Sequence, residues 1–276
     1  MILLDGKKLA QKIFEETKKE IQERKMKLRL AVVYVGKNPV SEKFINEKKK
    51  RGNEIGVDTR VYPCDETITT NELRKKIAEI VHEKRNTGVI IQLPLPSHIN
   101  QQYILNSISP EKDVDILSAH AVGNYAVGKS KIAPPVAGAL RAFFDEYSID
   151  YREKHIVILG AGALVGKPAA LFFLNEKTTF SVIEKNFGNT RDIISRADII
   201  ISGIGNPKYI TGDMVKDGVI VIDAGTSESE GKIAGDADFD SVSKKASYIT
   251  PVPGGVGPVT VATIFKNLVL LARKEK

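Results

Sequence analysis

The stretch "HIVILGAGALVGKPAALFFL", His155 to Leu174, decides the fold class. A short apolar run leads into three glycines and then into an apolar helical segment, the order of a strand, a tight turn and a helix. Gly160 permits the turn, Gly162 lets the backbone approach a pyrophosphate, and the N-terminus of the helix that follows Gly166 offers N–H donors. The stretch predicts a dinucleotide-binding loop, although a purely structural turn would show the same glycines.

Similar strand-like runs lie on both sides of this stretch. The later runs are "TTFSVIEK", "ADIIISGIG" and "GVIVIDAGT", and the earlier runs are "LRLAVVYVG" and "TGVIIQLPLP". Helical segments accompany the earlier runs, namely Lys8 to Arg24, the segment that carries Phe44 and Lys48, and "TNELRKKIAEIVHEK". Alternation of strands and helices predicts α/β architecture with parallel sheets.

A segment rich in glycine, alanine and proline, "SAHAVGNYAVGKSKIAPPVAG", separates the two series of strands and predicts a domain boundary. The last helical segment, "TVATIFKNLVLLARKEK", is expected to pack back on the first domain. We therefore expect two α/β domains around a cleft. Residues 1–137 plus 258–276 form an N-terminal catalytic domain, and residues 138–257 form a C-terminal Rossmann-like dinucleotide-binding domain.

The composition restricts the class of protein. The 276 residues include 42% hydrophobic and 27% charged residues, no apolar run long enough to span a bilayer, and a single cysteine, Cys64. One cysteine excludes an internal disulfide framework and a cysteine-rich zinc site, which predicts a cytoplasmic protein. The net charge of +7 indicates an anionic partner. A phosphorylated cofactor or a polyglutamylated substrate fits better than nucleic acid, because the basic residues are scattered and no aromatic platform accompanies them.

Three further segments carry candidate site residues. Glu184 and Lys185 end the strand after the glycine loop, where the carboxylate favours NAD and the lysine favours NADP, so both cofactors stay open. The segment "TPVPGGVGPVT", Thr250 to Thr260, excludes a helix or central strand through it and suits close approach of a flat ligand, or is a plain surface loop. In "SEKFINEKKKRG", Ser41, Phe44 and Lys48 share one helical face, whereas the neighbouring cations are expected to point to solvent or to an anionic tail.

Four stretches together resemble the methylenetetrahydrofolate dehydrogenase/cyclohydrolase family of one-carbon metabolism: "AVVYVGKNPVSEKF" with its following lysine, "VIIQLPLP", "PEKDVD" from Pro110, and "TPVPGGVGP". The resemblance runs almost end to end. It implies oxidation of methylenetetrahydrofolate by hydride transfer to a nicotinamide cofactor, and hydrolysis of the methenyl product to formyltetrahydrofolate. It also implies a homodimer that needs no metal. From the sequence pattern we expect neither nucleic acid nor a membrane as a partner.

The resemblance implies a role for each residue that matches a family motif. The catalytic set is Lys48, Gln92 and Asp115, with Asp115 holding the pterin through paired, charge-assisted hydrogen bonds. The remaining positions are Phe44, Pro253, Gly254 and Gly255 for the substrate, and Gly160, Ala161, Gly162, Val165, Gly166 and Lys185 for the cofactor. Burial and neighbouring cations would lower the pKa of a lysine so that it can transfer protons, and an uncharged glutamine would orient its amine.

The chain departs from the family pattern at several positions. Phe44 replaces the common tyrosine and has no hydroxyl to relay a proton, Ile116 replaces a glycine, and "APPV" stands at Ala133 to Val136 in place of "PCTP". Ala161 and Gly162 stand where relatives often have Arg-Ser, so recognition of the extra phosphate of NADP falls to Lys185. We expect NADP, with NAD possible.

Three hypotheses follow from the sequence. The first is the bifunctional enzyme, and the second is a dehydrogenase whose hydrolase step is weakened by the missing tyrosine hydroxyl. The third is a basic nucleotide-binding or RNA-binding protein that keeps the fold without catalysis. The third is disfavoured because Lys48, Gln92 and Asp115 are all present.

Overall fold

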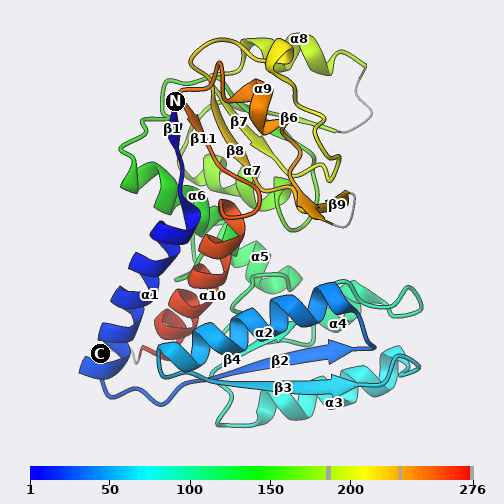
Figure 1. Ribbon diagram of the computed structural model, residues 1–276. Helices are drawn as coiled ribbons and strands as arrows, with labels where there is room; N and C mark the ends of the chain where they lie inside the picture. The colour runs from blue at the N-terminus through cyan, green and yellow to red at the C-terminus, as the bar shows by residue number, and fades with distance from the viewer. Residues whose placement is uncertain (185–187, 230–231, 274–276) are drawn as a thin grey trace. The chain divides into compact units, whose positions relative to one another are not determined.

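The computed structural model describes residues 1–184, 188–229 and 232–273. Contacts divide the chain into two compact units, each made of two pieces. We call residues 1–11 and 135–260 the six-stranded unit, and residues 12–134 and 261–276 the three-stranded unit. Two helices contribute residues to both units, α1 (Gly6–Glu23) and α10 (Val256–Ala272) (Figure 1).

The six-stranded unit contains a wholly parallel sheet in the order β1-β11-β8-β7-β5-β6. Its strands are β1 (Ile2–Leu3), β5 (Ile156–Leu159), β6 (Phe180–Ile183), β7 (Ile199–Ser202), β8 (Ile220–Asp223) and β11 (Tyr248–Ile249). A short antiparallel pair, β9 (Ser227–Ser229) and β10 (Lys232–Ala234), stands apart from this sheet. Strands β5, β7 and β8 are buried along their whole length, as strands covered on both faces must be.

Helices cover the six-stranded sheet on both faces, and they are α6 (Pro135–Glu146), α7 (Gly166–Asn175), α8 (Thr190–Arg196), the 3₁₀ turn η1 (Gly212–Met214) and α9 (Phe239–Val242). Ile194, Met214 and Val242 bring α8, η1 and α9 into one apolar core with the sheet. Phe144 of α6 lies against Phe172 and Phe173 of α7. The predicted Rossmann-like α/β arrangement is confirmed.

The three-stranded unit holds a parallel sheet in the order β3-β2-β4. Its elements are β2 (Arg29–Val35), α2 (Pro39–Glu54), β3 (Asp58–Cys64), α3 (Thr70–His82), β4 (Gly88–Ile91), α4 (Gln101–Leu105) and α5 (Ala119–Ala126). Figure 1 shows α3 on one side of β2 and β3 and α2 on the other. The α3 side is an apolar core that includes Val33, Ile77 and Ile91. On the described residues, no helix is both long and apolar enough to cross a membrane.

Residues 1–11 pack with the six-stranded unit, because β1 pairs with β11 through Ile2 and Tyr248. One expectation needs correction. Helix α10 begins at Val256, inside the proline-glycine segment that was expected to exclude a helix. Pro258 is tolerated there because N–H groups in the first turn of a helix have no intrahelical partner.

The turn between β5 and α7 has two glycines with opposite steric surroundings. A Cβ atom on Gly166 would lie 1.8 Å from the Gly160 carbonyl oxygen, and Gly160 itself has φ +91°. A Cβ on Gly162 would meet no atom within 4 Å. The fold therefore needs glycine at 160 and 166, and leaves position 162 sterically free.

We predict that Gly166→Ala lowers the stability of the protein, because overpacking against backbone costs about 1–3 kcal/mol or more. Gly162→Ala in the same loop is the matched control and should leave the melting temperature nearly unchanged. Thermal unfolding followed by circular dichroism compares the two variants with the parent protein. Equal melting temperatures for the two variants would contradict this account of the turn.

Candidate active site

Helix α2 presents Lys48 from a buried face. The Asn38 side chain accepts a hydrogen bond from the Ser41 N–H, 2.9 Å, close to the start of the helix. Ser41, Ile45 and Lys48 recur at helical spacing and are 3%, 5% and 8% exposed. A lysine is almost never buried without a partner, so its surroundings define the site.

Gln92 is that partner. It directly follows β4, and its backbone N–H donates to the Val33 carbonyl of β2, 2.9 Å. The Lys48 Nζ donates to Gln92 Oε1 at 2.9 Å, and Gln92 Nε2 donates to the Leu93 carbonyl at 2.8 Å. The second contact fixes the amide so that its oxygen faces the amine. A neutral acceptor thus holds the amine without adding a negative charge.

Asp115 completes the charge pattern of this site. Its residue keeps some exposed surface, but protein atoms surround its carboxyl, and this burial raises the pKa of Asp115 to about 6. Lys48 opposes that shift and Asp113 adds to it. Burial lowers the pKa of Lys48, and Asp115 opposes that effect. The pKa values of both groups are therefore shifted toward neutral pH.

The three basic residues that follow Lys48 differ in their surroundings. Lys49 and Lys50 are exposed, as expected. Arg51 instead pairs with Glu47 and Glu54 of its own helix, at 2.8 and 3.0 Å, and its guanidinium lies 5.6 Å from the ring centre of Phe14. Arg51 is thus partly exposed, with carboxylates one turn away on either side of it.

Phe44 lies one turn before Lys48 but is 38% exposed, an unusual exposure for a large apolar ring. Nothing in the described structure covers its ring with an aromatic partner. An open aromatic face beside a buried lysine is a surface on which a flat ring could stack.

The glycine loop between β5 and α7 has the features of an anion site. Gly162 is exposed with open space beside it, and α7 has no side-chain cap at its N-terminus. The Ala161 N–H donates to Glu184 Oε1, 2.8 Å, so the carboxylate at the end of β6 reaches the loop. These residues fit a dinucleotide. Lys185 lies outside the described residues.

Two buried aspartates that the sequence did not single out hold the neighbouring loops. Asp236 accepts from Ser202 Oγ and from the N–H groups of Ile204 and Asn206, at 2.7 to 2.9 Å. Asp223 accepts from the N–H groups of Gly225 and Ala237, both at 2.8 Å. Burial, with Asp236 adding, raises the pKa of Asp223 to about 6. Both stand at the carboxyl edge of the sheet, where such folds bind ligands.

The proline-glycine segment lies in the six-stranded unit. Pro253 is exposed, whereas Gly254 and Gly255 are buried. A Cβ on Gly6 would lie 1.7 Å from the Gly255 carbonyl oxygen, and Gly254 has φ +112°. A Cβ on Gly255 would lie 2.6 Å from the Pro251 carbonyl oxygen of the same segment. The local backbone thus requires glycine at 254 and 255 whether or not a ligand approaches them.

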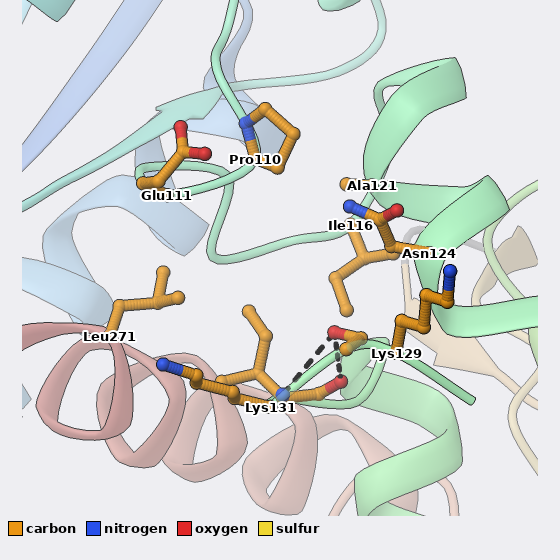
Figure 2. A pocket seen from close by; sticks show the side chains of 10 residues that line it. Pro110, Glu111, Ile116, Ala121, Asn124, Lys129, Lys131 and Leu271 are labelled. Atoms are coloured by element: carbon orange, nitrogen blue, oxygen red, sulfur yellow. Dashed lines mark hydrogen bonds between the residues drawn. The ribbon is translucent and has the colours of Figure 1, made fainter. Parts of the chain in front are cut away.

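A pocket of about 250 Å³ in the three-stranded unit contains none of the predicted site residues (Figure 2). Its wall includes Ile116, Asn124, Lys129, Lys131 and Leu271. Ile116 directly follows Asp115 and has φ +52°, a conformation that a β-branched residue rarely adopts. The departure from glycine at this position therefore leaves a strained backbone next to the site.

The structure brings together part of the predicted site. Lys48 and Gln92 are hydrogen-bonded, and Asp115 interacts with Lys48 electrostatically. The glycine loop and Pro253 to Gly255 belong to the other unit. The residue missed closest to the site is Asp113, for which the available signal was the pair of aspartates in "PEKDVD".

Comparison with known proteins agrees over both units. Residues 4–115 match the model described as tetrahydrofolate dehydrogenase/cyclohydrolase, catalytic domain, and residues 134–276 match the NAD(P)-binding domain of the same description. A "Bifunctional protein FolD" of Sulfurihydrogenibium sp. is 42% identical over 281 residues, covering 100% of this chain and 99% of that protein.

Solved structures of similar proteins give the same result. The bifunctional methylenetetrahydrofolate dehydrogenase/cyclohydrolase of Campylobacter jejuni superposes with a TM-score of 0.94 at 42% identity, covering 99% of this chain and 98% of that one. A Trypanosoma brucei enzyme complexed with NADP cofactor and inhibitor gives 0.92 at 31% identity, covering 98% and 96%. The chain belongs to the tetrahydrofolate dehydrogenase/cyclohydrolase family.

Proposed function

We propose that the protein oxidises methylenetetrahydrofolate to methenyltetrahydrofolate with NADP and then hydrolyses the product to formyltetrahydrofolate. The observation that carries the proposal is the buried Lys48 amine held by Gln92, with Asp115 acting on it electrostatically. Membership of the family supports both activities. We propose that the boundary between the substrate domain and the dinucleotide-binding domain lies at the proline-rich segment near residue 137.

Lys48 is the proposed proton-transfer group of the hydrolytic step. Adding water to a methenyl cation requires that a proton leave the attacking water and that a ring nitrogen be protonated. Burial lowers the pKa of Lys48, which makes its neutral, proton-accepting form more accessible near neutral pH. Gln92 keeps the amine oriented through its side-chain oxygen.

Asp115 is the proposed anchor of the pterin. Adjacent N–H donors on an aminopyrimidinone edge suit a carboxylate, which accepts two hydrogen bonds in a charge-assisted pair. Phe44 offers a stacking face, and Pro253, Gly254 and Gly255 are proposed to lie against the folate. Hydride transfer requires chiefly that donor and acceptor be positioned, so these residues serve both steps.

The proposed cofactor site comprises Gly160, Ala161, Gly162, Val165, Gly166 and Lys185. A bound nicotinamide cofactor would accept the hydride. The glycine loop and the N-terminus of α7 would hold its pyrophosphate, and Lys185 its extra phosphate. The Trypanosoma brucei relative, solved with NADP, supports NADP over NAD. We further propose a homodimer that accepts polyglutamylated folates in the cytoplasm.

A dehydrogenase without strong hydrolase activity is the second candidate, and exposed Phe44 in place of tyrosine favours it. One assay separates the two. Purified protein is given methylenetetrahydrofolate with NADP or NAD, and the methenyl and formyl products are followed separately. Formation of both above the uncatalysed rate supports the bifunctional enzyme. Formation of methenyltetrahydrofolate alone supports the second candidate. Formation of neither product contradicts both candidates.

We predict that Lys48→Met suppresses the hydrolase by roughly 10²–10⁴-fold and the dehydrogenase less, because only hydrolysis needs a positioned acid-base group. Lys49→Met removes the adjacent, exposed amine and is the matched control. Initial rates of both reactions on each variant are the measurement. Full hydrolase activity in Lys48→Met would remove this lysine from the mechanism.

Phe44→Tyr should raise the hydrolase rate a few-fold with little change in hydride transfer, because it supplies a hydroxyl one turn from Lys48. Phe44→Leu removes the ring and should raise the KM for folate in both reactions. Steady-state kinetics of the two variants distinguish a proton relay from a stacking surface. An unchanged hydrolase rate in Phe44→Tyr would show that the hydroxyl is not limiting.

Lys185→Ala should weaken NADP binding by about 1.5–3 kcal/mol and leave NAD nearly unaffected, because only NADP carries the extra phosphate. Glu184→Gln should act in the opposite direction and favour NADP, because it removes a negative charge beside the loop while keeping an acceptor for the Ala161 N–H. Ratios of kcat/KM for the two cofactors test both variants. Equal losses for NADP and NAD in Lys185→Ala would refute the assignment.

A further inference from the structure

Asp113 stands behind the proposed pterin anchor and has no role in the mechanism above. It forms an isolated parallel bridge with Val89 of β4, and its side chain is 1% exposed. It lies two positions before the anchor Asp115, with Val114 between them. Its position in the fold therefore links the three-stranded sheet to the loop that carries the site.

One oxygen of Asp113 shapes that loop. Its Oδ2 accepts from the N–H groups of Leu117, 3.1 Å, and Ser118, 2.8 Å. The Ser118 hydroxyl in turn accepts from the Ala121 N–H and caps α5. The turn that contains Asp115 is thereby closed by a side chain from its own beginning.

The other carboxylate oxygen of Asp113 takes no part in closing the turn. On the described residues, its Oδ1 is buried and has no hydrogen-bond partner. A buried carboxylate oxygen without a donor is unfavourable, and buried polar atoms in proteins are nearly always paired. An asparagine could close the same turn without a buried charge. A purely structural role therefore leaves the charge unexplained.

The charged groups around Asp113 show where that charge acts. Lys112 is no counterion, because its Nζ donates to the Val81 and Glu83 carbonyls at the end of α3. From α10, the neutral Asn267 donates to the Val114 carbonyl, 2.9 Å. Asp115 remains, with Lys48 of α2 beyond it. Burial is the main cause of the raised pKa of Asp115, and Asp113 adds to it, in the direction expected of two neighbouring carboxylates. Burial also raises the pKa of Asp113, and its hydrogen bonds from Ser118 and Leu117 oppose that shift.

We propose that Asp113 is a positioning residue for both reactions: it closes the turn that presents Asp115, and its buried negative charge sets the pH at which Asp115 becomes an effective anchor. This inference rests on the proposed function. Asp115 then ionises beside a second carboxylate, Asp113, so the acid limb of activity depends on both groups.

Asp113→Asn tests the charge apart from the shape. The asparagine oxygen can still accept from Leu117 and Ser118, whereas the negative charge is gone. Loss of a neighbouring anion makes ionisation of Asp115 easier, so the acid limb of kcat/KM for the dehydrogenase should move to lower pH by about one unit. Glu111→Gln removes an exposed carboxylate from the same segment and should not move the limb.

A purely structural role would lower activity or the melting temperature without moving the pH profile. A profile of Asp113→Asn that coincides with the parent enzyme therefore overturns the proposal. If the parent enzyme produces no methenyltetrahydrofolate at any pH, the proposed function has failed instead. The two failures are thus distinguished by the parent enzyme alone.

Carbon-13 NMR of the aspartate carboxyls in the parent enzyme provides a second test that needs no folded Asp113→Asn protein. Asp115→Asn identifies the Asp115 signal. The proposal expects Asp113 to stay ionised through neutral pH and its signal to respond as Asp115 titrates. An Asp113 carboxyl that is protonated at neutral pH, or that ignores the titration of Asp115, would overturn it.

Discussion

Removal of the Lys48 amine from water is the constraint around which the three-stranded unit is arranged. An ammonium ion in a buried position is costly, and a carboxylate in direct contact would offset that cost by forming a salt bridge. Such a partner would also hold the proton firmly. The structure instead gives Lys48 a neutral amide at 2.9 Å and leaves the acid, Asp115, to act through space. The amine is thus stabilised enough to be buried and still free to exchange its proton.

Both units place their chemistry at the carboxyl ends of parallel strands. Gln92 follows β4, and in the other unit Gly160, Asp223 and Ser202 end or follow β5, β8 and β7. Strands buried on both faces cannot carry polar groups along their length, so these groups collect where the strands stop. Buried aspartates then fix the loops that begin there, as Asp236 does after β7. The same device recurs in Asp113, which closes the loop before α5.

Strands with continuous apolar sequences could be predicted, because burial on both faces leaves an unmistakable pattern. Strand β3 (Asp58–Cys64) was not identified, because polar residues interrupt it and Pro63 lies within it. Its place at the edge of the sheet tolerates that proline. Strand β1 has only two residues and is defined by a partner near the other end of the sequence. Local pattern carries no information about such a pairing.

The residues of the candidate site likewise divide into those that the sequence could predict and those that it could not. Lys48 and Gln92 lie 44 positions apart, and only the likeness to a family suggested that they meet. The buried aspartates 113, 223 and 236 were overlooked because an aspartate near a glycine or a turn looks like an ordinary turn former. Their burial and their multiple acceptor contacts exist only in the folded chain. Conversely, Ile116 was visible as a departure from the family, and its left-handed backbone gives that departure a physical meaning.

The division of each unit into two sequence pieces has a consequence for how the chain is made. Strand β1 cannot pair until Tyr248 has left the ribosome, because Ile2 lies opposite that residue in the sheet. At about 5–20 residues per second, the wait is on the order of 10–50 s. The three-stranded unit must wait longer still, since Phe265 of α10 lies in its core against Phe14. The two units therefore cannot fold one after the other during translation. Both must reach their final packing after nearly all of the chain has emerged.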